Sequence, residues 1–444
     1  MKPRRFVCTA PALIILLTAW SVFPFGGTGM GGAVIPHPSL GSKNPAYEAY
    51  PARFGYNPGI QLPVGLLGLL PAERNPFLYA TNRDTFRSRF DFLQFYDQVS
   101  YPSSFLLNPP VSPEKVMLSI EEGSVRIEDG RGNPLVFRET MGTRGISVGG
   151  TPLIPPPLLS LPLRTGNFYF KTGFFGGGGG YRFYPDTALS DALEAAEFSP
   201  HTQYSIRGGG SIQSGISQSL TFAAPVFEGH NSRTFFGARL LLFYMAGFVD
   251  GDVHISMATD ARALPVFAGI QWNYFYLYPG MGGGYGMRLD SGAVFDRGPL
   301  TFGIGFLNLL GFAQLHGYAS DFSFYGTEEE VPESRTFSRF LPGIFSNVAY
   351  ELRSPFGKIV LTGDIGYVTG WVMHGGFLVI GKRTFFRMGA GWDGASRFGT
   401  SFGLRAKKKW FELALTTHEA PLVGGMVFGI AFHTGRYFLA PETR

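Results

Sequence analysis

Large apolar residues alternate with small or polar ones along the last two thirds of this chain. The pattern is clearest over residues 285–310, where one set of alternate positions holds Tyr, Met, Leu and Phe, and the other holds Gly, Arg, Asp and Thr. Successive side chains of a β-strand point to opposite faces, so this pattern predicts strands with one large apolar face. The Asp296-Arg297-Gly298-Pro299 sequence between the two arms indicates a turn, and the stretch therefore predicts an antiparallel hairpin.

The residues on the second face of these strands distinguish a soluble sheet from a membrane barrel. A soluble sheet buries its apolar face and places Lys, Glu or Thr on the other. Glycine in their place indicates an interior that is either crowded or lined by water, as in a transmembrane barrel whose apolar face contacts lipid. The 444 residues include 62 Gly, 44 Phe and 20 Tyr, and only 16% are charged, against roughly 25% in soluble domains. Composition therefore favours the barrel.

We predict an all-β fold, a transmembrane antiparallel β-barrel of about 14 strands formed by residues 167–438, with an N-terminal plug-like segment. The mean hydropathy of +0.08 is too polar for membrane helices and is typical of alternating strands. Many candidate strands have the roughly 9–11 residues of a tilted membrane strand. The candidates include 203–210, 215–223, 234–246, 251–258, 300–309 and 316–325. The barrel requires Phe302, Phe386, Phe428 and Phe432 to face outward. If the C-terminus is periplasmic, the short turns at 354–357, 381–383 and 406–408 lie on the periplasmic side, and the long segment 326–341 lies on the outside.

The region before the barrel divides into three parts. Residues 1–27 combine Lys2, Arg4 and Arg5 with an apolar stretch, which predicts a secretory signal peptide; an uncleaved anchor is the alternative. Residues 28–113 are rich in Pro and Gly and form the plug-like segment, with a helix predicted over 84–100 that packs in the lumen or on the barrel rim. Residues 114–166 predict a small hairpin turning at Glu122-Gly123, followed by a Pro-rich connection. A further short helix is predicted over 186–198.

Two groups of residues resemble a known family. Gly29-Met30-Gly31-Gly32-Ala33 with Asn44-Pro45-Ala46 is similar to the start of mature outer-membrane barrels of the long-chain fatty-acid transporter superfamily, which includes TraF-like and PorV-like barrels. The 289–293 and 299–309 stretches resemble a hairpin of the same group. The resemblance implies that the N-terminal segment folds inside the barrel as a plug, with Asn44, Pro45 and Ala46 in the lumen. The compressed spacing of the N-terminal motifs and the Leu-Ala-Pro-Glu-Thr-Arg end depart from the family pattern.

Charged residues on the small face are the candidate functional residues. Charge within a membrane span is tolerated only toward water or a partner, so these side chains are expected in the lumen. We expect them to hold the plug or brace the wall by ion pairs, or, as the alternative, to guide a solute. They are Arg239, Arg288, Asp290, Asp364, Arg387 and Arg405.

The glycine run is the candidate for a lateral opening. It comprises Gly176, Gly177, Gly178, Gly179 and Gly180. No Gly-Lys-Ser/Thr follows it, which argues against a phosphate-binding loop. The run predicts strand kinks or bulges, or else a gap in the wall of the kind that the family resemblance implies as an exit route.

Other chemistry is not indicated. The histidines lack metal-ligand spacing, so we predict no metal and no cofactor, and no Ser and His set is selected as catalytic, so we predict no enzyme. Cys8, the only cysteine, lies in the predicted signal. The dispersed net charge of +5 predicts no nucleic-acid partner. The expected function is passive passage of a small, hydrophobic solute through a Gram-negative-type outer membrane, with outer-membrane lipids as partners. The alternative is a non-transporting barrel that anchors or assembles with envelope proteins.

Overall fold

A computed structural model describes most of the second half of the chain and part of the first. The described residues are 27–51, 60–61, 64, 104–107, 117–121, 124–128, 147–148, 151–152 and 159–436, the last range without 196, 324–328, 339, 341, 356, 368–370, 393–395, 407–408 and 420–425. The predicted signal up to residue 26 and the predicted helix over 84–100 lie outside them. No helix in the part of the chain that is described has the length and apolar character to cross a membrane.

Antiparallel strands make up nearly all of the ordered structure. The strands of the main sheet are β1 (Ile60–Gln61), β2 (Ser104–Leu106), β7 (Leu159–Thr165), β8 (Phe168–Pro185), β9 (Gln203–Glu228), β10 (Ser232–Thr259), β11 (Pro265–Leu277), β12 (Gly283–Arg297), β13 (Leu300–Ser323), β14 (Glu329–Phe337), β15 (Gly343–Ser354), β16 (Gly357–Tyr367), β17 (Trp371–Ile380), β18 (Thr384–Trp392), β19 (Ser396–Ala406), β20 (Lys409–Glu419) and β21 (Met426–Arg436). Two separate hairpins are β3 (Met117–Glu121) with β4 (Ser124–Glu128), and β5 (Ser147–Val148) with β6 (Thr151–Pro152). The helices are η1 (Gly27–Met30), η2 (Pro38–Ser42), η3 (Pro45–Glu48) and α4 (Thr187–Ala195).

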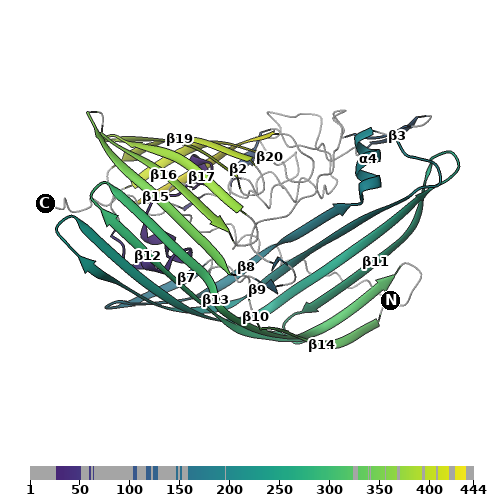
Figure 1. Ribbon diagram of the computed structural model, residues 1–444, viewed down its shortest axis with the longest axis horizontal. Helices are drawn as coiled ribbons and strands as arrows, with labels where there is room; N and C mark the ends of the chain where they lie inside the picture. The colour runs from purple at the N-terminus through teal and green to yellow at the C-terminus, as the bar shows by residue number, and fades with distance from the viewer. Residues whose placement is uncertain are drawn as a thin grey trace.

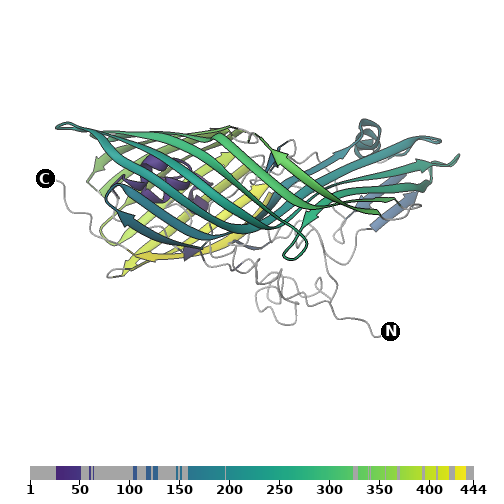
Figure 2. The same cartoon turned by 90° about the horizontal axis from the view of Figure 1, so that it is seen from below.

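The main sheet curls round on itself, and the predicted all-β barrel is confirmed (Figures 1 and 2). Pairing continues from β7 through β10 to β12 and β13, and then from β15 to β21. The other edge of β21 pairs with the short β1 and β2. The sheet has 17 strands where the sequence predicts about 14. Apart from the short β1 and β2, its strands begin at Leu159, whereas the sequence places the start of the barrel at residue 167. Pro162 is accommodated in β7 because β7 pairs only with β8 among the described strands.

Three strands are much longer than a membrane span, and they extend the sheet beyond the barrel wall. β10 pairs with β12 over Ser232–Met245 and with β11 over Phe248–Thr259, while β13 pairs with β15 near its start and with β14 over Ala313–Asp321. β11 and β14 therefore lie at the far end of the molecule from residues 27–51, drawn in purple (Figure 1). We call this part, with the far ends of β8, β9, β10 and β13, the sheet extension. The sequence predicts two strands in each of β9, β10 and β13, because glycines and bulges resemble breaks when no pairing partner is known.

The two faces of the wall are those that the alternation predicts. Phe302, Phe386, Phe428 and Phe432 expose 37%, 38%, 50% and 43% of their surfaces, whereas the intervening Thr301 and Arg387 are each 2% exposed. The hairpin of β12 and β13 forms as expected, with Arg297 opposite Leu300 and Gly298 at a φ of +57° in the turn. The predicted hairpin at Glu122-Gly123 and the helix within 186–198 are confirmed as β3–β4 and α4. Asp186 caps α4 by accepting from Leu189 N at 2.7 Å.

Candidate functional site on the inner wall

Residues 27–51, which we call the inner segment, lie inside the curled sheet (Figures 1 and 2). Helix η3 contacts β9, β10 and β12, and η1 contacts β17, β18, β19 and β20, so the segment reaches opposite parts of the wall. Six of its apolar side chains have no exposed surface: Met30, Ala33, Ile35, Leu40, Ala46 and Tyr47. The inner segment therefore forms a core with the inner face of the barrel wall.

Local sequence explains the shape of the inner segment. His37 and Asn44 occupy the N-cap positions of η2 and η3, each is followed by proline at the first helical position, and each side chain accepts a backbone N–H two residues on. Asn44 also joins the segment to the wall, because its Oδ1 accepts from Ala46 N while its Nδ2 donates to Ala293 O and Ile304 O, all at 3.0 Å. These two carbonyls belong to facing residues of β12 and β13. Asparagine suits this position because one amide group is both acceptor and double donor.

Glycines on the inner wall allow the segment's backbone to approach the sheet. A Cβ at Gly237 would overlap Pro45 and Ala46, one at Gly292 would overlap the Asn44 side chain, and one at Gly305 would overlap Lys43 and Asn44. The sequence left open whether the small face is crowded or lined by water. At these positions it is crowded, because backbone of the inner segment occupies the space that a side chain would take.

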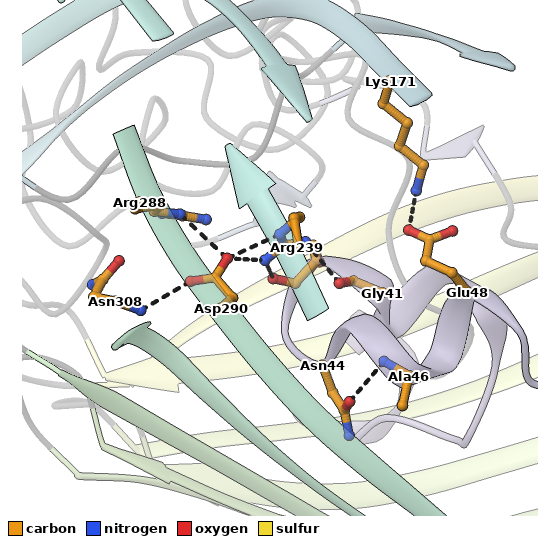
Figure 3. A network of polar contacts seen from close by, with 10 residues as sticks. Gly41, Asn44, Ala46, Glu48, Lys171, Arg239, Arg288, Asp290 and Asn308 are labelled. Atoms are coloured by element: carbon orange, nitrogen blue, oxygen red, sulfur yellow. Dashed lines mark hydrogen bonds and ion pairs between the residues drawn. The ribbon is translucent and has the colours of Figure 1, made fainter. Parts of the chain in front are cut away.

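Arg239, Asp290 and Arg288 form a buried ion-pair network between the wall and the inner segment (Figure 3). Arg239 donates to Asp290 Oδ2 through Nε at 2.9 Å and Nη2 at 2.6 Å, and to Gly41 O and Ser42 O at 2.7 Å each. Asp290 also lies 3.4 Å from Arg288 Nε and accepts from Asn308 N at 2.9 Å. Charges buried this deeply are retained only when paired and hydrogen-bonded, and here they fix the C-terminal end of η2 to β10 and β12.

Asp364 makes a second attachment. Its Oδ2 accepts from Val34 N at 3.2 Å, and its Oδ1 lies 2.7 Å from His374 Nδ1. On the same strand, Thr362 donates to Val34 O at 2.7 Å. Both backbone groups of Val34 are thereby satisfied by side chains of β16, which explains how an irregular segment is accommodated inside the wall.

Arg387 and Arg405 lie elsewhere on the wall. Arg387 is paired with Glu412, whose Oε2 is 3.1 Å from His433 Nδ1, and the Arg387 guanidinium lies over the Phe385 ring. This cluster joins β18, β20 and β21 next to η1, since a Cβ at Gly29 would meet Glu412 and Ser401. Arg405 is half-buried near the end of β19 beside the turn to β20. The predicted charged residues are thus divided among four places.

Several contacts of the inner segment were missed by the sequence reasoning. Lys171 pairs with Glu48, Tyr47 donates to Asn347 Oδ1 at 2.8 Å, and Tyr50 Oη lies 3.1 Å from Thr301 Oγ1. Consistent use of the period of two would have identified Glu412, because it lies between Phe411 and Leu413. No sequence signal pairs Lys171 with Glu48, because the two residues are far apart in the chain and only the fold brings them together.

The Gly176–Gly180 run pairs with β9 through Gly179, and the register shifts between Gly179 and Arg182. On its other edge β8 pairs with β7 only over Phe168–Phe174. The run therefore lies beyond the end of β7, and an opening here stays a prediction.

Apolar residues replace polar ones on the inner wall toward the sheet extension. Phe175, Leu241, Phe243, Met245, Phe248, Phe275, Leu277, Ala313, Leu315 and Phe340 form one buried cluster, with Phe337 packed against it. Along β10 the inward positions change from Gly237 and Arg239 beside the inner segment to Leu241, Phe243 and Met245 in this cluster. We call it the apolar inner cluster.

Comparison with known proteins gives only distant similarity. No family model and no curated protein matches the chain. One similar solved structure is the Ralstonia pickettii toluene transporter TbuX, with 9% identity and a TM-score of 0.33 over 63% of this chain and 80% of that one. Another is the CymD monoaromatic hydrocarbon channel, with 10% identity and a TM-score of 0.29 over 63% of this chain and 82% of that one. Because these scores are low, the fold assignment depends on this chain's own strand pairing.

Proposed function

We propose that this protein is an outer-membrane barrel that gives passive passage to a small hydrophobic solute. The apolar inner cluster carries the proposal. A barrel that conducts water-soluble compounds has a polar interior, whereas here three successive inward positions of β10 are Leu241, Phe243 and Met245, each at most 5% exposed. Such a wall favours a solute without hydrogen-bonding groups, because polar solutes would lose their hydration there without compensation.

The inner segment is the second feature that supports the proposal. Its attachments run from Lys171 on β8, through Arg239 and Asp290, to Asp364 on β16. A solute that reaches the apolar inner cluster would therefore meet the inner segment as a plug, as the resemblance to the fatty-acid transporter superfamily implies. In the proposed orientation the short turns, such as that between β15 and β16, face the periplasm, and the sheet extension faces outward.

Flux into liposomes tests this function. The purified protein is reconstituted, and the entry of toluene, a medium-chain fatty acid and small sugars is compared with that in protein-free liposomes. We expect faster entry of the hydrophobic compounds and no swelling with sugars. Phe243→Thr should slow hydrophobic entry about tenfold, equivalent to about 1.4 kcal/mol, because it places a hydroxyl in the apolar inner cluster. Phe236→Thr is the control, since Phe236 is on the same strand and is 42% exposed on the outer face.

A non-transporting barrel that anchors envelope proteins is the second candidate. The buried ion pairs of Arg239 and Asp290 favour it, because they fix the inner segment in place. Liposomes that admit neither hydrophobic compounds nor sugars faster than protein-free ones would support this second function and contradict the first.

A further inference from the structure

A row of aromatic side chains crosses the outer face of the sheet extension. Trp272, Tyr274, Tyr276 and Tyr278 occupy alternate positions at the end of β11 and just beyond it, and Tyr318 of β13 lies directly opposite Tyr276. Successive ring centroids are 5.6, 5.6 and 5.9 Å apart, and Tyr276 and Tyr318 are 6.0 Å apart. The rings of Tyr276 and Tyr278 are within 9° of parallel. We call these five residues the aromatic row.

The aromatic row is held in place by its neighbours. Gly251 lies opposite Tyr274, and a Cβ there would come within 3.4 Å of Trp272 Nε1 and 2.9 Å of Tyr274 Cβ, so glycine leaves room for these side chains against the sheet. Tyr276 donates its hydroxyl to Glu330 Oε1 of β14 at 2.8 Å. Partial desolvation and the Glu330 carboxylate raise the pKa of Tyr276 to about 12, so this hydroxyl remains a donor at neutral pH.

The position of the row along the strands separates it from the lipid-facing band. On β13 the outward side chains from Leu300 to Phe312 are apolar, with Phe302, Phe306 and Leu310 at least 37% exposed, and they are followed by Gln314 and His316. At about 3.3 Å per residue, the apolar part already covers the roughly 25 Å height of the band on a tilted strand. Tyr318, and with it Tyr276, lies beyond these polar residues, so the aromatic row stands in water beyond the hydrocarbon.

The charge around the row selects the kind of ligand. The facing residues on β10 are Val249, Gly251 and Val253, which are neutral, and among the described residues the carboxylate of Glu330 accepts a hydrogen bond from the row. This combination disfavours anionic ligands such as phosphorylated sugars or nucleic acid. Flat aromatic faces with phenolic hydroxyls and a carboxylate acceptor match a ligand that has C–H faces and hydroxyl donors together.

We propose that the aromatic row binds a neutral oligosaccharide, a chain of hexoses lying along β11. Trp272, 51% exposed, and Tyr278, 46% exposed, offer ring surface at the two ends, and Glu330 accepts from a sugar hydroxyl near the middle. The proposal is independent of any transport, because the row lies on the opposite face of the sheet from the apolar inner cluster.

Binding is tested with the full chain in sugar-free phosphatidylcholine bilayers. Maltoheptaose, cellohexaose, a mannan oligosaccharide and a dextran oligosaccharide are titrated by calorimetry. We expect saturable binding of at least one, weakened at least tenfold in Trp272→Ala/Tyr276→Ala. Tyr367→Ala/Trp371→Ala is the matched control, because these residues form another exposed Tyr–Trp pair with centroids 5.2 Å apart at the β16–β17 end, and it should bind as the parent does.

Three outcomes would overturn the proposal. The first is that the parent protein binds none of the four sugars saturably. The second is that both double variants lose sugar affinity equally. The third is that phosphorylated maltoheptaose binds more tightly than neutral maltoheptaose. Heat-dependent electrophoretic mobility identifies folded barrel in every sample, so a loss through misfolding is distinguished from a loss of the binding surface.

Discussion

At the scale of single residues, glycine on the inner wall is selected by contact with the inner segment. Gly292 illustrates this, because its Cα faces the Asn44 side chain with no room for a methyl group. Gly363 is a glycine on the outer face, where a Cβ would lie 3.6 Å from His374 O and 3.9 Å from Val348 Cγ1, which are ordinary contacts. The same residue type thus has a packing role at one site and none at the other.

The first prediction compares these two glycines. Gly292→Ala should lower the free energy of unfolding by about 1–3 kcal/mol, the usual cost of overpacking, and should expose residues 27–51 to protease. Gly363→Ala should change neither. Urea unfolding in lipid bilayers and limited proteolysis measure the two effects. Equal behaviour of the two variants would contradict the crowding of the inner wall by the segment.

At the scale of elements, buried charge joins the inner segment to the strands. Arg239 on β10 donates to both Asp290 on β12 and the carbonyl groups at the end of η2. Removal of Asp290 takes the carboxylate from the buried Arg239, and removal of Arg239 leaves Asp290 with Arg288 at 3.4 Å and abolishes the hydrogen bonds to η2. Exposed pairs contribute little by comparison. Lys358 and Glu351, 3.0 Å apart with side chains 49% and 15% exposed, provide a pair that is much more accessible than Arg239 and Asp290.

The second prediction uses this contrast. Arg239→Met and Asp290→Asn should each destabilise the protein by about 3–5 kcal/mol, and the double variant should lose less than the sum of the two because the interaction between Arg239 and Asp290 can be lost only once. Lys358→Met should cost less than about 1 kcal/mol. Strict additivity of the two buried substitutions would show that Arg239 and Asp290 do not act as a pair.

At the scale of the whole molecule, the apolar band on the outer face sets which part of the sheet lies in hydrocarbon. Phe306 is in the band on β13, whereas Val249 is on the outer face of β10 in the sheet extension, opposite Tyr276, and the two are 38% and 44% exposed. A charge on a lipid-facing barrel position costs about 2–4 kcal/mol at the bilayer midplane and little in water.

The third prediction is therefore that Phe306→Arg destabilises the barrel in lipid by about 2–4 kcal/mol, while Val249→Arg has almost no effect. Unfolding followed by tryptophan fluorescence in bilayers gives both values. A similar cost for the two substitutions would mean that the band is misplaced.

The sequence by itself determined the fold class and the two faces of the wall, because alternation is a local property that every strand carries. Phe302 and Phe428 were placed outward, and Arg239 and Asp290 inward, from periodicity alone. Strand lengths were not determined, since Gly208–Gly210 and the bulge after Met245 resemble strand ends until β8, β9 and β10 supply pairing partners.

Only the tertiary structure decided what fills the interior. Val34 meets Asp364, Lys171 meets Glu48 and Tyr47 meets Asn347 across long chain separations, and no local pattern encodes such proximity. The aromatic row likewise needs β11 beside β13 to bring Tyr276 to Tyr318. Side-chain direction follows from the geometry of one strand, whereas contacts between distant segments exist only after the sheet has closed around them.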